Sequence, residues 1–320
     1  MKRSGSTGDV HDLDLLYSAA HMYYDEDMGQ SEIAKQLNVS RPTVSRMLST
    51  ARERGMVQIK VIHPNADGNA ELSADLREAL SLDSVYLARG LQASAHGTGM
   101  QNAVIRAIHD MGLQPGDGLV ISSGMAVYGT TAMDLPDLTG VSLAPAVGGV
   151  AEPEPWHQTN EIVRTIAQRT GASYTPIFAG AIPSPLMYQA VQEDDAFSEV
   201  RQIWHYAKGS LVGVGALTTG RTSISKAIPQ DMLEGSVGDV CLHFFNASGQ
   251  EMEFPGSDRT IRISLEDLRA IPYSTAIAVG AEKVQSIITA STMKLFRRLV
   301  TDEVTAKLIL QSLEQSEPSS

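Results

Sequence analysis

Apolar residues in the stretch Gln30–Arg52 recur at the spacing of two short helices that are separated by a tight bend. On each helix the apolar positions fall three or four residues apart and so share one face. Asn38 stands where the chain must reverse, and Asn tolerates the left-handed backbone conformation that a tight bend needs. The pattern therefore predicts a helical hairpin. Its inner-face residues are Ile33, Ala34 and Leu37 on the first helix and Val44, Met47, Leu48 and Ala51 on the second.

The second helix of this hairpin begins with capping signals and has a polar outer face. Ser40 is a good N-cap, and Pro42 falls in the first turn, where a missing N–H group costs little. Such a helix suits the DNA major groove, because arginine reads guanine edges and hydroxyl groups reach bases or phosphates. The alternative is an ordinary helical hairpin with solvated arginines. The predicted DNA contacts are Gln30, Ser40, Arg41, Thr43, Ser45 and Arg46.

The segments on either side of the hairpin predict a small DNA-binding module and a connection to a second domain. Residues 1–11 are short and polar and are expected to be disordered, whereas Asp12–Tyr24 has a helical stripe that would pack under the hairpin. Val57–Ile62 is an approximate strand, and His63–Ala70 is the clearest linker. The helix Glu71–Leu80 is either a domain adapter or a dimer contact. Its apolar stripe consists of Leu72, Leu76 and Leu80.

From residue 82 onward, short apolar runs alternate with helical patterns. This rhythm predicts an α/β domain with a mostly parallel, doubly wound sheet, in which ligands bind outside the carboxyl ends of the strands. The predicted strands are Ser84–Ala88, Leu119–Ser122, Ser142–Val147, Tyr174–Ala179, Leu211–Val214, Asp239–Phe244 and Thr275–Val279. The predicted helices are Gly99–Met111, Thr130–Leu135, Glu161–Arg169, Leu186–Tyr206, Gln285–Met293 and Glu303–Leu313.

Length and composition support a small module attached to a large domain. A chain of 320 residues with 42% hydrophobic residues can bury a substantial core. We expect a DNA-binding domain over residues 1–62, a linker with a short helix over 63–81, and an effector domain over 82–320. The chain lacks an apolar run of about 18 residues and a secretory signal pattern, so a cytoplasmic protein without a membrane span is expected.

The charge distribution separates the two parts. Residues 30–60 carry six basic and two acidic side chains, a net charge of +4, within a chain whose formal net charge is −12. The remainder therefore carries a net charge of −16. A basic module on an acidic body is typical of a DNA-binding regulator.

Six motifs give the chain a resemblance to the SorC/DeoR-type family of sugar-binding transcriptional regulators, over nearly its whole length. The resemblance implies an effector domain similar to the glucosamine-6-phosphate deaminase and ribose-5-phosphate isomerase fold. It also implies a sugar or sugar phosphate as effector, and a homotetramer that acts on operator DNA. The motifs lie at Gln30–Leu48, Tyr128–Thr131, Val237–Phe245, Ile263–Pro272, Val279–Lys283 and Leu299–Ala306.

A loop of small residues, Ser122–Thr131, is the first candidate for effector binding. Small residues let backbone N–H groups approach an anion, and the start of a following helix adds a favourable dipole. The hydroxyl groups of Thr130 and Thr131 would add donors, and the resemblance implies that the Gly129–Thr130 pair is a phosphate cradle. The alternative is a plain strand-to-helix turn with Thr caps.

Four further residues complete the predicted effector site. Gly148 either admits a ligand or permits a turn, and Asn160 either caps a helix or faces the ligand, as the resemblance implies. The resemblance also implies that Asp239 holds sugar hydroxyls and that the Lys283 ammonium completes a phosphate site. The alternatives are a turn residue at Asp239 and a surface lysine at position 283.

The chain shows little sign of metal binding or catalysis. Its one cysteine, Cys241, excludes an intramolecular disulfide and a cysteine-cluster metal site, and its eight histidines lack metal-ligand spacing. No metal and no cofactor are therefore expected. A sugar-phosphate isomerase or deaminase with a DNA-binding arm is the alternative function, but it needs a positioned general base. Asp239, Glu152 and Glu282 are the candidates, and none has a second group at a suitable spacing.

Overall fold

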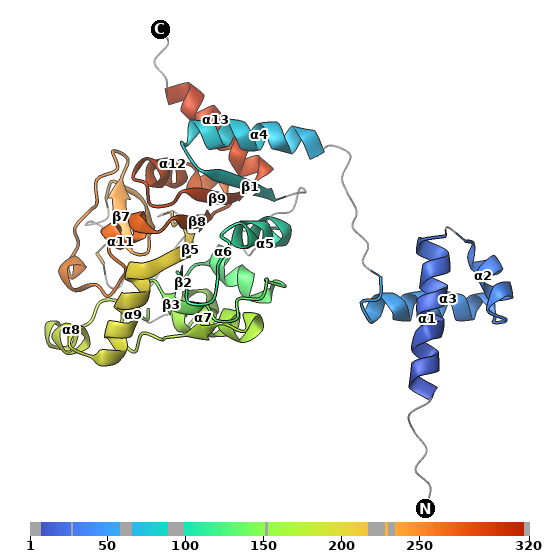
Figure 1. The fold of residues 1–320 in the computed structure, drawn as a ribbon. Helices are drawn as coiled ribbons and strands as arrows, with labels where there is room; N and C mark the ends of the chain where they lie inside the picture. Colours follow the sequence, from blue (N-terminus) through green and yellow to red (C-terminus); the bar gives the residue numbers. More distant parts are fainter. Residues whose placement is uncertain are drawn as a thin grey trace, which may run out of the picture. The chain divides into compact units, whose positions relative to one another are not determined.

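A computed structural model of the chain describes residues 8–26, 28–57, 66–88, 99–150, 153–216, 228–229 and 234–316. The chain forms two compact units, Met1–Ala66 and Asp67–Ser320, each with its own core (Figure 1). We call them the helix-turn-helix unit and the effector unit.

The helix-turn-helix unit consists of α1 (Gly8–Tyr24), α2 (Gln30–Gln36) and α3 (Arg41–Glu53). Asn38 has a φ of 53°, which confirms the predicted left-handed bend between α2 and α3. The predicted inner faces are confirmed as well, except that Leu37 is only partly buried. The core contains Leu16, Ala19 and Ala20 of α1, Ile33 and Ala34 of α2, and Val44, Met47, Leu48 and Ala51 of α3.

The ends of this unit differ from the prediction or lie outside the described residues. The helix α1 begins at Gly8, so the expectation of disorder is wrong for residues 8–11. Val57 has no regular secondary structure, and the rest of the strand predicted over Val57–Ile62 lies outside the described residues.

The effector unit is built on a seven-stranded sheet in the order β1-β9-β8-β5-β2-β3-β4, in which all neighbouring strands are parallel. The chain builds outward from β2 to β4 in one direction and from β5 to β9 in the other, so the strand order reverses between β2 and β5. The strands are β1 (Ser84–Ala88), β2 (Gly118–Ile121), β3 (Ser142–Pro145), β4 (Ser173–Tyr174), β5 (Ala207–Gly213), β8 (Tyr273–Ile277) and β9 (Arg298–Asp302). A separate antiparallel hairpin consists of β6 (Ser236–Val240) and β7 (His243–Asn246).

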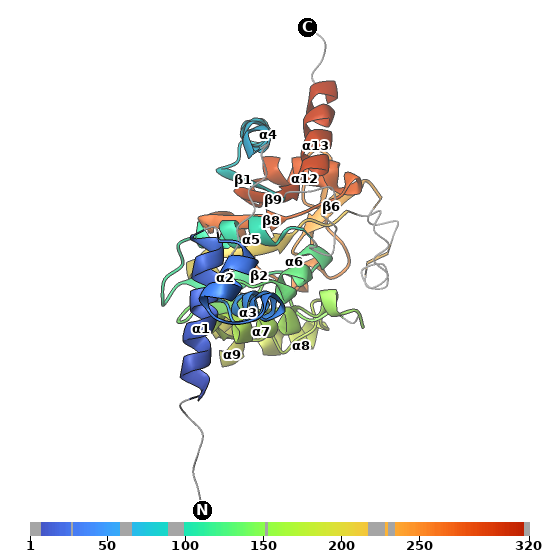
Figure 2. The same cartoon turned by 90° about the vertical axis from the view of Figure 1, so that its right-hand side faces the viewer.

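Helices cover both faces of the sheet, which confirms the predicted α/β class. Successive residues of β2 point to opposite faces, with Leu119 in one core and Val120 in the other. One core takes side chains from α5 (Gln101–His109), α6 (Met125–Gly129) and α7 (Thr159–Thr170). The other takes side chains from α4 (Ala66–Ala79), α9 (Asp195–Tyr206), α11 (Leu265–Ala270), α12 (Val284–Thr292) and α13 (Glu303–Ser316). In Figures 1 and 2, α4 and α13 lie at the β1 end of the unit and α8 (Pro185–Gln192) lies at the opposite end.

The predicted linker His63–Ala70 is wrong from Ala66 onward, because α4 begins there. The first turn of α4 contains the turn-forming residues that predicted a linker. Further along, Leu76 is fully buried, and Leu80, just after the helix, is 5% exposed. Both side chains lie in the core of the effector unit. The leucine stripe therefore packs within the unit, and it gives no support to a dimer contact.

Two predicted elements are each broken in two. The helix predicted over Leu186–Tyr206 is α8 followed by α9, because Asp194 caps α9 by accepting the N–H groups of Ala196 and Phe197 at 2.8 and 3.2 Å. The strand predicted over Asp239–Phe244 contains the turn of the β6–β7 hairpin. The strand predicted over Tyr174–Ala179 is reduced to β4, and β9 and α11 were not predicted.

Among the described residues, no helix combines the length and the hydrophobicity that a membrane span requires.

Candidate DNA-binding and effector-binding sites

The first turn of α3 is held by its own side chains. The Thr43 N–H group donates to the Ser40 hydroxyl at 3.3 Å, and the hydroxyl oxygens of Ser40 and Thr43 lie 2.7 Å apart. At the start of α2, the Gly29 N–H group donates to the Glu32 carboxylate at 3.0 Å. Both helices of the hairpin are thus fixed at their N-termini, where the backbone N–H groups lack partners within the helix.

The outer face of α3 carries the predicted DNA contacts. Arg41, Ser45 and Arg46 are exposed, and Thr43 is partly buried. Val44, one residue from Ser45, is fully buried, so the helix has a sharp division between its core face and its polar face. Five of the six predicted contacts, Ser40 to Arg46, therefore lie within the first turns of one helix, and Gln30 begins α2.

In the effector unit, the carboxyl ends of β2 and β5 are joined by a side chain. The Gly213 N–H group, at the end of β5, donates to the Ser122 hydroxyl at 2.9 Å, and that hydroxyl donates to the Ser123 carbonyl at 2.8 Å. These two strands flank the point where the strand order reverses. Ligands of open α/β sheets bind in the crevice outside this point, so the loops that meet here form the candidate effector site.

Asp239 lies beside this point. It pairs with Gly215, just after β5, through two backbone hydrogen bonds of 2.8 and 3.2 Å. Its side chain is buried and accepts the Leu242 N–H group at 3.3 Å. Burial, together with the Asp239 carboxylate, raises the pKa of the Cys241 thiol, so this thiol stays protonated.

Lys283 comes from the loop after β8 and reaches the same region. It ends the short 3-10 helix η6 (Ala281–Lys283) and is 9% exposed, so it is not the surface lysine of the alternative interpretation. A Cβ atom at Gly238 would lie 2.4 Å from Ser286 Cβ, which shows how closely β6 packs against the first turn of α12. In the sequence, Asp239 follows Gly238 directly, and Lys283 precedes Ser286 by three residues.

The loop Ser122–Thr131 differs from the prediction. The helix expected over Thr130–Leu135 is wrong, because α6 begins at Met125, after Gly124 with a φ of 123°. Thr130 is fully buried and donates its hydroxyl to the Val127 carbonyl at 2.6 Å, while Thr131 donates to the Tyr128 carbonyl at 2.7 Å. Gly129 ends α6, so these three residues lie at the helix C-terminus and not at its N-terminus.

Gly148 and Asn160 fix backbone segments that follow β3 and β4. A Cβ atom at Gly148 would lie 3.0 Å from both the carbonyl oxygen of Ala179 and the backbone of Ala181, so only glycine fits this crossing without a shift. The Asn160 amide accepts from the Ile177 N–H group at 3.0 Å and donates to the Ile177 carbonyl at 2.9 Å. Each residue thereby shapes the edge at which the candidate site lies.

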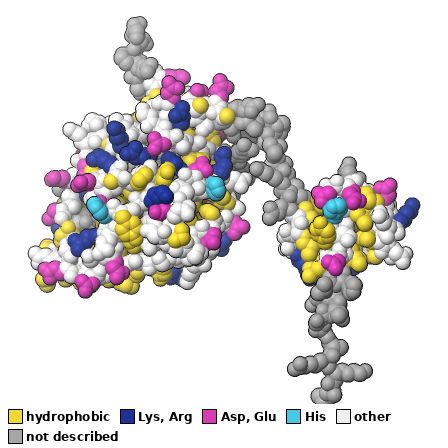
Figure 3. Space-filling model, in the orientation of Figure 1, with side chains coloured by type: hydrophobic (Ala, Val, Ile, Leu, Met, Phe, Trp, Pro, Cys, Tyr) yellow, Lys and Arg dark blue, Asp and Glu magenta, His cyan; other side chains and the backbone are white. Residues whose placement is uncertain are grey.

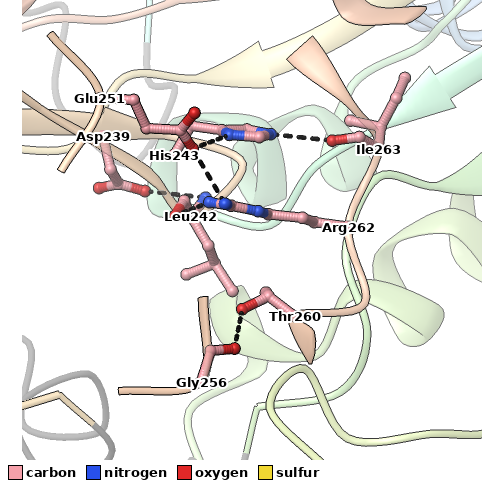
Figure 4. Close-up of polar contacts among 8 residues, drawn as sticks. All are labelled: Asp239, Leu242, His243, Glu251, Gly256, Thr260, Arg262 and Ile263. Carbon is pink, nitrogen blue, oxygen red and sulfur yellow. Dashed lines mark hydrogen bonds and ion pairs between the residues drawn. The ribbon is translucent and has the colours of Figure 1, made fainter. Parts of the chain in front are cut away.

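The turn between β6 and β7 is strained and is held by buried charges (Figure 4). Cys241 and Leu242 have φ values of 52° and 65°, although turns with two positive φ values strongly favour Asn and Gly. Arg262 donates to the Leu242 carbonyl at 2.5 Å, opposite the bond from the Leu242 N–H group to Asp239. Both backbone groups of Leu242, the N–H and the carbonyl, are therefore bonded to charged side chains.

A second set of contacts anchors Arg262 itself. Its guanidinium donates to Glu251 at 2.9 Å, and His243 lies 2.6 Å from the same carboxylate oxygen. The hydrogen bond to His243 lowers the pKa of Glu251, against the opposing effect of burial, whereas burial lowers the pKa of Arg262. Sequence reasoning missed Arg262 and Glu251. The one signal in the sequence was the position of Arg262 between two apolar residues, Ile261 and Ile263. Both isoleucines are buried in the structure.

The described part of the chain contains no group of three or more His, Cys, Asp or Glu side chains that could hold a metal ion. Of the general-base candidates, Asp239 is bonded to the Leu242 N–H group and Glu282 is exposed, and Glu152 lies outside the described residues.

Two family models match the chain. The model described as "Putative sugar-binding domain" matches residues 65–311, and the model described as "IclR helix-turn-helix domain" matches residues 23–59.

Individual relatives match the two units together. The chain is 30% identical over 319 residues to the sorbitol operon regulator of Klebsiella pneumoniae. The aligned region covers 94% of this chain and 98% of the relative. It is 29% identical to the deoxyribonucleoside regulator of Bacillus subtilis, with coverage of 93% and 98%. The crystal structure of the full-length sorbitol operon regulator SorC from K. pneumoniae superposes with a TM-score of 0.78 at 27% identity, covering 93% of this chain and 99% of that one.

Proposed function

The chain belongs to the sugar-binding domain family of SorC-type regulators, and from this premise we propose that it is a transcriptional regulator whose operator binding is controlled by a sugar or a sugar phosphate. The observation that carries the proposal is the capped helix α3, with Arg41, Ser45 and Arg46 exposed on its outer face, in the same chain as a sheet domain of this family. The relatives are named as a sorbitol operon regulator and a deoxyribonucleoside regulator.

We assign DNA binding to residues 1–62 and effector binding to residues 82–320, and α4, which precedes the second range, packs in the core of the effector unit. In the first part, Arg41 and Arg46 read bases or bind phosphates, aided by Gln30 and Ser45. Ser40 and Thr43 have a dual role, since their hydroxyls also cap the helix. A helix of this kind enters the major groove with its N-terminal residues against the base edges.

In the second part, we assign the effector to the crevice outside the carboxyl ends of β2, β5 and β8. Lys283 binds a phosphate or another anionic group, and Asp239 accepts hydroxyl groups of the sugar. Gly129, Thr130 and Thr131 support this site as the end of α6. Gly148 and Asn160 set the position of the neighbouring backbone, as their contacts with residues 177–181 indicate.

We further propose that the protein acts in the cytoplasm as a homo-oligomer, a dimer or a tetramer. One recognition helix contacts too few base pairs to select a site in a genome, so two or four must act together. An enzymatic role is the less favoured function, because the relatives are named as regulators and the residues here suggest no paired general acid and base.

The test is differential scanning fluorimetry of the full chain against a panel of free and phosphorylated sugars. A ligand present at 100 times its dissociation constant stabilises the folded state by about 2.7 kcal/mol, so the effector should raise the melting temperature by a few degrees. A panel without any stabilising sugar would count against the effector site. Turnover of ribose 5-phosphate or glucosamine 6-phosphate would favour the enzyme.

A further inference from the structure

Three charged side chains lie together in the interior of the effector unit, beside the β6–β7 turn. On the face shown in Figure 3, acidic and basic side chains are scattered over the surface of this unit. The side chains of His243 and Arg262, in contrast, are only 5% and 11% exposed, and Glu251, which contacts both, is 33% exposed. A buried ion pair contributes little to net stability, because the loss of hydration offsets the attraction of its charges. Stability alone therefore gives little reason for these buried charges.

The backbone of Arg262 is held by a loop of the candidate effector site. Residues 261–263 run antiparallel to the segment that follows β3, with Val147 opposite Arg262. Two backbone hydrogen bonds of 2.8 Å, one of them from the Gly148 N–H group to the Ile261 carbonyl, join the two segments. The Arg262 side chain therefore starts from the segment that packs beside Gly148.

From this segment, the Arg262 side chain reaches the β6–β7 hairpin (Figure 4). One guanidinium nitrogen donates to the Leu242 carbonyl at 2.5 Å, and the other terminal nitrogen donates to Glu251 at 2.9 Å. The donors of a guanidinium group have fixed directions, so a single side chain sets the positions of both acceptors. Arg262 thus joins the segment after β3 to the turn between β6 and β7.

The turn depends on such support, because Cys241 and Leu242 both have positive φ values. Residues other than glycine keep this conformation only where their surroundings enforce it. The Leu242 N–H group donates to the Asp239 carboxylate at 3.3 Å, so the conformation of the turn and the direction of this carboxylate depend on each other. A shift of Leu242 would therefore move the carboxylate as well.

We propose that Arg262 is a positioning residue of the effector site, which holds the β6–β7 turn so that Asp239 faces the hydroxyl groups of the sugar. This inference rests on the proposed role of Asp239. Arg262 acts through Asp239 and needs no contact with the effector. Its loss should therefore weaken the binding of a free sugar and of the corresponding phosphate alike, unlike the loss of Lys283.

Isothermal titration calorimetry of the full chain tests the inference. The probe is the sugar that raises the melting temperature of the wild type most, in the panel of free and phosphorylated sugars. Arg262→Lys keeps the buried charge but loses the two fixed donors, so it should weaken binding on the order of tenfold, the scale of one hydrogen bond to a charged group. The matched control is Arg269→Lys, because Arg269 also donates to a backbone carbonyl, that of Met293, just after α12. The control should bind the probe as the wild type does.

The Asp239→Ala chain distinguishes positioning from a general loss of structure. A residue that acts through Asp239 has little to position when the carboxylate is absent, so adding Arg262→Lys should change the affinity by no more than about twofold. Wild-type affinity in Arg262→Lys, or equal losses with and without Asp239, would overturn the positioning role and leave the effector site intact. Unchanged affinity in Asp239→Ala would overturn the proposed role of Asp239, and the inference with it.

A glycine in the turn provides a second test, which does not require residual binding by Asp239→Ala. Glycine adopts positive φ values without steric cost, so Cys241→Gly should make the turn less dependent on Arg262. The loss of affinity caused by Arg262→Lys should then shrink from about tenfold to about threefold or less. An equally large loss in the wild-type and Cys241→Gly chains would overturn the inference.

Discussion

The Nδ1 atom of His243, on strand β7 of the hairpin that carries Asp239, lies 2.6 Å from the Oε1 atom of Glu251. The Nε2 atom of the same ring lies 2.9 Å from the Ile263 carbonyl, so both ring nitrogens face acceptors. A protonated ring donates to both, whereas a neutral ring has a single N–H group. Arg262 contacts both the Leu242 carbonyl and Glu251. These contacts therefore connect the strained β6–β7 turn to Glu251 and to residues 262–263.

The first prediction concerns acid sensitivity at this hairpin. Because the bond to His243 lowers the pKa of Glu251, the carboxylate stabilises the fold above its unfolded pKa of about 4.3. That contribution is lost as the pH falls through the lowered pKa. Glu251→Gln should therefore lower the thermal unfolding midpoint at pH 7, and lower it less at pH 3. Glu253→Gln, at an exposed carboxylate, is the control, and an equal loss for Glu251→Gln at both pH values would contradict the prediction.

The second prediction concerns base reading by α3. Arg46→Ala should weaken binding to a specific operator by about 1–3 kcal/mol if Arg46 contacts a base. If it contacts phosphate, the loss should be similar on all sequences and the salt slope should fall by about one unit. Arg41→Ala should behave in one of these two ways. Arg54→Ala, at an exposed arginine just beyond α3, is the matched control, and full operator affinity in both Arg41→Ala and Arg46→Ala would remove α3 from this role.

The third prediction concerns the crossing after β3. Gly148→Ala places a Cβ atom 3.0 Å from the backbone of residues 179 and 181, so it should destabilise the effector unit by about 1–3 kcal/mol. At Gly149 the nearest atom would lie at an ordinary 3.5 Å, so Gly149→Ala should change stability much less. Urea unfolding of the two variants makes the comparison. Equal stabilities would show that the crossing relaxes without cost.

The helix-turn-helix unit was predictable because its determinants are local. Ser40 caps α3 through a residue three positions away, and Asn38 adopts the left-handed bend without help from distant residues. The inner faces follow the helical period directly. The start of α1 was predicted four residues too late, because the apolar stripe of this helix begins at Leu13.

The effector site was less predictable because distant contacts decide its turns. Cys241 and Leu242 favour a continuous strand, yet Arg262, 20 residues further along, and Asp239 hold them in a turn. In the loop Ser122–Thr131 the chain offers two glycines, and the structure starts α6 after Gly124 and ends it at Gly129. Composition alone does not distinguish these two arrangements. Asp239 and Lys283 were assigned from the family resemblance, and their role in effector binding stays a prediction.

The fourth prediction separates two roles at the candidate effector site. Lys283→Ala should weaken a phosphorylated effector much more than the corresponding free sugar, because it removes the charge that attracts the phosphate. Asp239→Ala should weaken both ligands, because it removes an acceptor for sugar hydroxyls. Isothermal titration calorimetry gives both affinities. If the wild type binds the free sugar as tightly as its phosphate, Lys283 does not bind a phosphate, and the site recognises a neutral polyol.

Control of DNA binding by the effector unit is tested most directly by the fluorescence anisotropy of a labelled operator fragment. The fragment is titrated with the full chain in the presence and absence of a saturating sugar that the chain binds. We expect one sugar or sugar phosphate to change the operator affinity by about 5- to 150-fold, which corresponds to a coupling free energy of about 1–3 kcal/mol. An unchanged operator affinity with the bound sugar at saturation would contradict the central claim that the effector unit controls DNA binding.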